Sequence, residues 1–248
     1  MTQIALIGDL HGNVPAVRAL ERDLQRRKID KIFCLGDSVG KGPDSDQTFD
    51  WMHAHCTVSL RGNWDEGIAL KQFAGDKFYY EQLGEERMEI LRCLPLEHHM
   101  TLSGRKIRMF HGRPVMENLL FIESEQEQLR PFFDPDFDVV IYADVHAQGL
   151  RVVKGKGLLC NIGSVGNAIG INKVEYAILS GDEADENAPL DITLVTLPYD
   201  FRQAAQDAKN QPDLPNREMY EYEVLTGIYT RKMLPSEVHK LLMEEYKR

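Results

Sequence analysis

Short apolar runs are the clearest pattern in this chain, and five of them end in Asp, Asn or His, which lie next to glycine in four of the five. The first run, residues 4–7, is too short and too unbroken for a surface helix and is typical of a buried parallel strand. In α/β sheets, ligand sites lie at the carboxyl ends of such strands. The runs cover residues 4–7, 31–35, 56–60, 105–110 and 139–142.

Other segments show helical spacing or hairpin patterns. Three early helices are predicted, at residues 14–24 with Asn13 as N-cap, 44–55 and 78–94. Three hairpins follow, at residues 100–110, 149–162 and 174–197. A largely parallel half therefore precedes a largely antiparallel half, and two packed sheets with outer helices accommodate both.

The chain turns polar and helical from residue 199, with helices predicted at 201–210, 217–225 and 235–246. We divide it into a main domain, residues 1–198, and a C-terminal helical appendage, residues 199–248. No chemistry is indicated in the appendage. We expect it to cover a sheet edge or to mediate self-association into a homo-oligomer.

The composition limits which kinds of partner are expected. The net charge of −10 makes a nucleic-acid duplex or an anionic membrane an unexpected partner. No early stretch resembles a signal peptide and no apolar run approaches about 18 residues, so we expect a cytoplasmic protein. The four cysteines lack C-x-x-C spacing, which indicates free, buried thiols and no structural zinc.

The polar residues at the strand ends are potential metal ligands. Asp, His and Asn without thiolate favour Mn, Fe, Zn, Ni or Mg. They outnumber what one ion needs, whereas two ions about 3.5–4 Å apart, sharing a carboxylate, would use them all. The candidates are Asp9, His11, Asp37, Asn63, His111, Asp144 and His146.

The order of these motifs resembles that of the calcineurin-like metallophosphoesterases. The family motifs D-x-H, G-D-x-x-G, G-N-H-D, H-G and G-H-x-H correspond to segments beginning at residues 9, 36, 62, 111 and 143. Residues 161–166 are similar to the N-P-G-S segment of the small bacterial branch. The resemblance, from residue 4 to about 165, implies a four-layer αββα sandwich of two mixed sheets flanked by helices.

The resemblance also implies roles for the ligands. It places Asp9, His11, Asp37 and His146 on one ion, and Asp37, Asn63, His111 and Asp144 on the other. Asp37 would bridge the two ions. In the family, a hydroxide between the metals attacks phosphorus in line, and paired cations lower the pKa of water and stabilise the developing charge.

Two positions depart from the family pattern. Asp144 stands where the family has His, and a third carboxylate lowers the net positive charge, which favours Mn and a weaker second site. Trp64 stands where the family has His or Cys. It either stacks on an aromatic leaving group or nucleobase, as in relatives that cleave diadenosine polyphosphates, or turns inward and packs.

Several other residues have weaker indications. We expect Asp65 to support a neighbouring ligand and Arg113 to contact phosphate, whereas a surface salt bridge is favoured for Arg61. Core or solvent-facing positions are favoured over pocket positions for Tyr79, Tyr80, Arg87 and Met88. No metal binding is expected of His53 and His55 on a helix, His98 and His99 before a strand, or His239 on a helix.

The predicted function is hydrolysis of a phosphodiester or a nucleotide phosphoanhydride by a dinuclear metal centre. Trp64 cannot donate a proton as His does, which favours substrates with good leaving groups, nucleotides among them. The alternative is a metal-binding scaffold protein with little turnover, as in the retromer scaffold subunit of this fold. Asp144 and Trp64 are the features that support this alternative.

Overall fold

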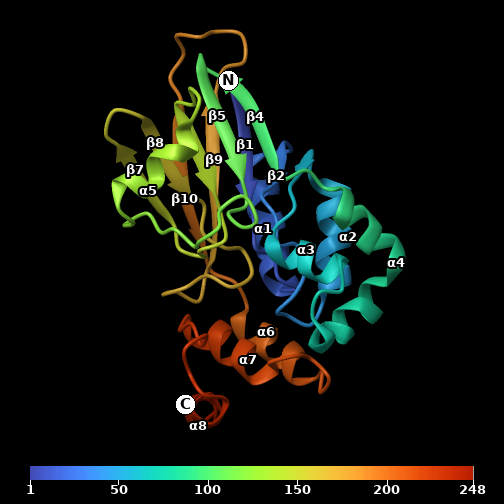
Figure 1. The fold of residues 1–248 in the computed structure, drawn as a ribbon. Coiled ribbons are helices and arrows are strands. Elements are labelled where there is room, and N and C mark those ends of the chain that lie inside the picture. Colours follow the sequence, from blue (N-terminus) through green and yellow to red (C-terminus); the bar gives the residue numbers. More distant parts are fainter. Residues whose placement is uncertain (248) are drawn as a thin grey trace.

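A computed structural model describes residues 1–247 of the chain. Two five-stranded sheets pack face to face at its centre (Figure 1). The first has the order β10-β9-β1-β2-β3, from β1 (Thr2–Ile7), β2 (Ile32–Cys34), β3 (Val58–Ser59), β9 (Val174–Gly181) and β10 (Asp191–Leu197). The second has the order β4-β5-β6-β8-β7, from β4 (Glu97–Leu102), β5 (Arg105–Phe110), β6 (Val139–Tyr142), β7 (Gly149–Val153) and β8 (Gly157–Asn161).

Both sheets are mixed, as the family resemblance implies. In the first sheet, β1, β2 and β3 are parallel, whereas β9 runs antiparallel to β1 and to β10. In the second, β5, β6 and β8 are parallel and carry β4 and β7 as antiparallel edge strands. The three predicted hairpins are confirmed, and the parallel strands end at one side of the molecule.

Strand β1 shows why the apolar runs are unbroken. Ile4 and Leu6 face the second sheet and pack in the core between the sheets. Ala5 and Ile7 face the opposite way and pack against the outer helices. All four are fully buried, because a strand covered on both faces needs apolar residues at every position.

The outer layers differ in thickness. Helices α1 (Val14–Arg27) and α2 (Ser45–His55) cover the first sheet, with Leu20 and Phe49 in the shared core. The second sheet is covered by the short α5 (Gln126–Leu129) and the 3₁₀ helix η2 (Arg130–Phe133). The αββα prediction is therefore confirmed, with one thin outer layer.

Some local predictions are wrong. Helix α3 (Asn63–Ala69) was not expected, and α4 (Lys77–Cys93) is interrupted at Gly84, whose φ of 70° is not helical. His98 and His99 lie inside β4 rather than before it. The Asn13 cap is confirmed, because its side chain accepts the backbone N–H of Ala16 at 3.1 Å.

The C-terminal segment consists of α6 (Phe201–Lys209), α7 (Arg217–Thr226) and α8 (Pro235–Glu245). It lies at the end of the molecule toward which the parallel strands run (Figure 1). Ala205 of α6 and Tyr220 of α7 belong to the same core as α1, whereas α8 packs on α7 through Val238. The inner two helices are therefore continuous with the main core.

The cysteines are unpaired, with Cys34 and Cys160 buried, Cys56 half-buried and Cys93 exposed. Burial raises the pKa of Cys160 to about 12, so its thiol stays protonated. Among the helices of residues 1–247, none is long and apolar enough to cross a bilayer.

Candidate metal centre

The strand ends bring the predicted acidic and histidine ligands together. The Oδ1 atom of Asp9 lies 3.1 Å from Nε2 of His146 and 3.5 Å from Nε2 of His11. Nε2 of His111 lies 3.2 Å from Oδ2 of Asp37. These residues are almost completely buried. Two groups result, Asp9, His11 and His146, and Asp9, Asp37 and His111, each with ligand atoms spaced as one metal ion requires.

Asp9 is thus common to both groups. The family resemblance implies the bridging role for Asp37, whose Oδ2 also lies 3.8 Å from Nε2 of His11. That role stays a prediction. The geometry shows two carboxylates, rather than one, lying between the histidines of the two groups.

Several buried atoms of this cluster make no hydrogen bond of good geometry among the described residues, although carboxylate and imidazole atoms face one another at the distances given above. They are both carboxylate oxygens of Asp9, the amide oxygen of Asn63 and Nε2 of His111. A buried polar group left unpaired costs about 1–3 kcal/mol. Bound cations would satisfy all of these atoms, so the residues fit divalent metal ions.

The histidines are oriented for metal binding. Nδ1 lies close to a backbone carbonyl oxygen in each ring: 3.2 Å from Val39 for His11, 2.8 Å from Leu35 for His111 and 2.6 Å from Asn167 for His146. A carbonyl only accepts, so Nδ1 donates its proton in each ring and Nε2 is the atom that faces the centre. The Nε2 atoms of His11 and His146 lie 3.2 Å apart, as expected of two ligands of one ion.

The pKa values of two histidines shift in opposite directions. Burial, assisted by the positive charge of Lys41, lowers the pKa of His11 to about 4. Burial alone would also lower the pKa of His111, but Asp37 and the other carboxylates raise it well above the ordinary value. His11 is therefore neutral and ready to bind a cation, whereas a cation at His111 would displace a proton.

The backbone at the centre is strained. Asp9, His11, Asp37, Asp144 and His146 all have left-handed φ values, between 47° and 66°. Such conformations are unfavourable for residues other than glycine, and they persist where the surrounding structure imposes them. Here they turn the chain sharply after each strand, so that the side chain points back toward the centre.

Asp65 supports the metal centre by accepting hydrogen bonds from backbone N–H groups, rather than by orienting the imidazole of a ligand. Its Oδ2 accepts the N–H groups of Asp37, at 2.7 Å, and Gly62, at 3.0 Å. Its Oδ1 accepts the N–H and the hydroxyl of Ser38. Burial raises the pKa of Asp65 to about 7, and Asp37 acts in the same direction. Asp65 therefore fixes the turn that presents Asp37.

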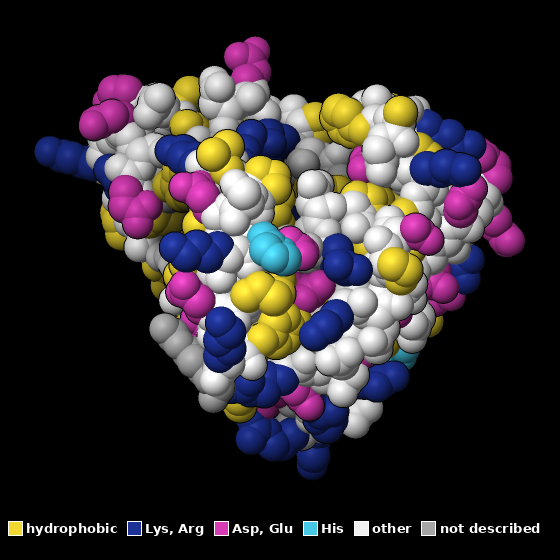
Figure 2. All heavy atoms as spheres, turned by 90° about the horizontal axis from the view of Figure 1, so that it is seen from below, with side chains coloured by type: hydrophobic (Ala, Val, Ile, Leu, Met, Phe, Trp, Pro, Cys, Tyr) yellow, Lys and Arg dark blue, Asp and Glu magenta, His cyan; other side chains and the backbone are white. Residues whose placement is uncertain are grey.

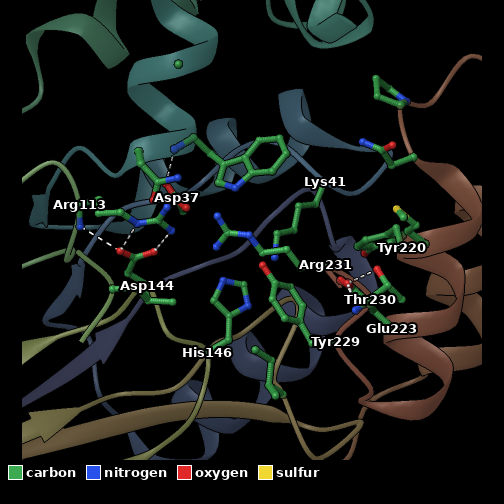
Figure 3. A pocket seen from close by; sticks show the side chains of 18 of the residues that line it. Asp37, Lys41, Arg113, Asp144, His146, Tyr220, Glu223, Tyr229, Thr230 and Arg231 are labelled. Carbon is green, nitrogen blue, oxygen red and sulfur yellow. Dashed lines mark hydrogen bonds and ion pairs between the residues drawn. The ribbon is translucent and has the colours of Figure 1, made fainter. Parts of the chain in front are cut away.

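Asp144 lies beside the cluster but belongs to neither ligand group. Its Oδ2 accepts the backbone N–H and the Nε–H of Arg113, at 3.0 and 2.8 Å, and its Oδ1 accepts from Nη2 at 2.5 Å. Oδ1 is 4.0 Å from Nε2 of His111. Both the metal-ligand role of Asp144 and the phosphate contact of Arg113 stay predictions, because each group is engaged with the other (Figure 3).

Trp64 is half-buried and lines the pocket beside the centre. Its backbone N–H donates to Oδ1 of Asp37 at 2.8 Å, and its ring stands edge-on to His11, with 5.9 Å between ring centres. A Cβ atom at Gly40 would lie 2.3 Å from this ring, so the ring packs directly on the glycine. Trp64 therefore combines packing with exposure to the pocket.

A pocket of about 620 Å³ opens over the centre. Asp37, Asn63, Asp144 and His146 lie on one wall, and the C-terminal segment supplies another with Tyr220, Glu223, Tyr229, Thr230 and Arg231 (Figure 3). The expectation that the appendage carries no candidate chemistry is thus corrected, because packing on α1 places it over the strand ends. Figure 2 views the molecule from below, where Lys and Arg side chains are interspersed with Asp and Glu.

Sequence reasoning missed Lys41, Tyr229 and Arg231 as pocket residues. Lys41 directly follows the G-D-x-x-G motif, which is a signal that could have been used. Tyr229-Thr230-Arg231 lies more than 80 residues beyond His146 and matches no motif, so only the folded chain reveals it. Among the helix residues considered earlier, Tyr79 lines the pocket, whereas Arg87 pairs with Asp50 on the surface.

The remaining side chains lie elsewhere. Arg61 is 3.4 Å from Glu66 in the salt bridge that the sequence favoured. Tyr80 bonds to the backbone of Phe73, and Met88 is buried in the core. None of the other five histidines belongs to either ligand group described for residues 1–247: His53, His55, His98, His99 and His239.

Comparison with known proteins adds independent information. Residues 2–184 match the family model of the calcineurin-like phosphoesterase superfamily domain. The uncharacterized protein MJ0912 of Methanocaldococcus jannaschii is 28% identical over 238 residues, which cover 82% of this chain and 90% of that protein.

Two solved structures share the fold. Hypothetical protein PH1004 from Pyrococcus horikoshii OT3 has a TM-score of 0.75 at 20% identity, over 92% of this chain and 100% of that chain. The metallophosphoesterase from Sphaerobacter thermophilus has a TM-score of 0.70 at 21% identity, over 92% and 99% of the two chains. At these identities the likeness concerns the fold alone.

Proposed function

Since this chain belongs to the calcineurin-like phosphoesterase superfamily, we propose that it is a metal-dependent hydrolase of a phosphodiester or a nucleotide phosphoanhydride. One observation carries the proposal. Buried oxygen and nitrogen atoms of Asp9, Asn63 and His111, without partners among the described residues, converge beneath an open pocket. Buried polar atoms without partners are uncommon, and a cluster of them from several strand ends is what a metal centre requires.

We propose two divalent ions as cofactors. Asp9, His11 and His146 would hold one, and Asp37, Asn63 and His111 the other, with Asp9 or Asp37 shared. When bound, such a pair supplies positive charge to the phosphoryl oxygens and makes water a better nucleophile. The carboxylates near both positions favour Mn over softer ions.

The remaining pocket residues would position the substrate. Asp65 holds Asp37 through the turn described above, so it acts as a positioning residue. Arg113 has a half-buried guanidinium at the pocket wall and could share its donors between Asp144 and a phosphoryl oxygen. Trp64 offers an aromatic surface for the leaving group. Since its indole N–H is a weak acid, the proposed substrates have leaving groups that depart without protonation.

A scaffold with bound metal and little turnover is the second candidate. The Arg113–Asp144 pair favours it, because an ion pair satisfies the carboxylate at the position where the family has a histidine ligand. The second ion would then have fewer ligands and would bind more weakly. This candidate predicts metal binding without hydrolysis.

Turnover assays in the presence of Mn distinguish the hydrolase from the scaffold. We would test aryl phosphate mono- and diesters and dinucleoside polyphosphates, and compare the wild type with Asp37→Ala and Asp50→Ala. Asp50 is a surface carboxylate paired with Arg87, so its variant controls for loss of one acidic residue. We expect Asp37→Ala to lower kcat/KM at least about 100-fold and Asp50→Ala to leave it unchanged. Absence of turnover on every substrate, with metal bound, would establish the scaffold instead.

A further inference from the structure

The pocket contains a second charged region besides the metal centre. Lys41 and Arg231 both line it and come from distant parts of the chain. Nζ of Lys41 donates to Oδ1 of Asn167 at 2.8 Å and lies 5.5 Å from the ring centre of Tyr229. Arg231 and Arg113 line the same pocket as Tyr229, and their positive charges oppose the rise in the pKa of the Tyr229 hydroxyl that burial and Glu223 cause.

Lys41 and Arg231 differ from Arg113 in one respect. Arg113 is neutralised by Asp144, whereas within residues 1–247 no carboxylate lies in ion-pair distance of Lys41 or Arg231. Lys41 is half-buried, and burial lowers its pKa despite attraction from Glu223 and Asp9. A chain with a net charge of −10 thus leaves two cations without a carboxylate partner in the pocket over the metal centre.

The loop that carries Arg231 is fixed in place. Glu223 is buried and accepts both the N–H and the hydroxyl of Thr230, at 2.9 and 2.7 Å. Gly227 has a φ of 73°, and a Cβ atom there would lie 2.6 Å from the backbone nitrogen of Ile171. The backbone is therefore held at Gly227 and at Thr230, which fixes the segment that carries Tyr229 and leads directly into Arg231.

The same side of the pocket connects to the metal centre. The side-chain oxygen of Asn167 accepts a hydrogen bond from Nζ of Lys41, and its backbone carbonyl oxygen accepts one from Nδ1–H of His146. One buried residue thus fixes both a proposed metal ligand and a cation of the second region. An anion bound to Lys41 and Arg231 would lie next to a group bound at the metal centre (Figure 3).

We propose that Lys41 and Arg231 bind a second, non-reacting phosphoryl group of the substrate. This inference rests on the proposed function and narrows its substrate class to molecules with at least two linked phosphoryl groups. A planar guanidinium and an ammonium together suit a dianionic oxygen cluster, and Arg231 can bind two oxygens at once. Arg231 lies outside residues 2–184, which match the family model, so the C-terminal segment would supply one of the two cations of this subsite and Lys41 of the main domain the other.

Binding of non-hydrolysable anions tests the subsite without turnover. Methylenebisphosphonate and methylphosphonate would be titrated calorimetrically into Mn-loaded protein at fixed ionic strength, because salt screens such contacts. We expect the wild type to prefer the bisphosphonate. Lys41→Met and Arg231→Gln should each weaken bisphosphonate binding about tenfold and methylphosphonate binding less than about twofold.

Matched variants make the test specific. Arg202→Gln removes a cation from the same segment, on α6 and outside the pocket, and should change neither affinity. Arg231→Lys should retain part of the preference, and circular dichroism would verify that each variant is folded. Equal affinity of the wild type for both phosphonates, or equal loss of both in the variants, would overturn the subsite. Failure of all turnover assays with this binding pattern intact would overturn the proposed function only.

Discussion

The approach of Gly62 to Asp37 allows a sharp test of how the centre is built. A Cβ atom at Gly62 would lie 2.1 Å from Oδ1 of Asp37 and 2.6 Å from its backbone nitrogen. Gly62 itself has φ −93° and ψ 179°, which alanine adopts without strain. Any effect of Gly62→Ala must therefore come from the contact with Asp37 and not from the local backbone.

The expected loss of stability follows from the space available for the added methyl group. Relieving a 2.1 Å contact requires Asp37 to move by roughly 1 Å. Its oxygen is held by the N–H of Trp64 and its backbone by Asp65, so the displacement strains both. Overpacking of this kind costs about 1–3 kcal/mol, while removing a glycine from the unfolded chain returns about 0.4–1 kcal/mol. We expect a net loss of about 1–2 kcal/mol.

Displacement of a proposed metal ligand should affect activity more than stability. A shift of about 1 Å in a reacting group can lower the rate about 100-fold. The assay compares urea unfolding, Mn affinity and kcat/KM for the wild type, Gly62→Ala and Gly75→Ala. Gly75 has no atom within 4 Å of its added Cβ and serves as the control. If Gly62→Ala gave the same result as Gly75→Ala in all three measurements, the reasoning would be refuted.

Two other substitutions have defined outcomes. Asp144→His removes the ion pair with Arg113 and supplies the ligand type of the family, so the weaker Mn ion should bind about tenfold more tightly; unchanged occupancy and rate would contradict this. Glu175 is buried, and burial raises its pKa to about 7, so the folded state binds more protons than the unfolded state between about pH 4.5 and 7. The free energy of unfolding should fall across this range in the wild type, and Glu175→Gln should be more stable by up to about 3 kcal/mol at pH 8 but not at pH 4. If the wild type and Glu175→Gln had equal urea midpoints at pH 8, Glu175 would not carry a buried charge.

Much of the fold could be predicted because the relevant signals are local. The apolar run before Asp9 must be a strand buried on both faces, and the structure shows Ile4 and Ile7 fully buried on opposite sides. The convergence of Asp9, His111 and His146 follows because the parallel strands of both packed sheets end at the same side of the molecule. Polar residues after each strand are visible in the sequence itself.

The unpredicted features depend on contacts between distant segments. The pairing of Arg113 with Asp144 occurs because two neighbouring strands end side by side, and neither motif indicates it alone. Tyr229 and Arg231 enter the pocket because α7 packs on the main core. The left-handed backbone of His11 has no signature in the sequence either, since it results from the turns that the folded strands require.

The Mn content of the protein at equilibrium tests the central claim most directly. Equilibrium dialysis followed by elemental analysis would count ions per chain in the wild type, Asp9→Asn, His146→Ala and His111→Ala. Since Asp9 belongs to both ligand groups, the account predicts about two ions in the wild type, one after loss of either histidine, and weakened binding of both in Asp9→Asn. A wild type without bound Mn, or an Asp9→Asn variant that binds as the wild type does, would contradict it.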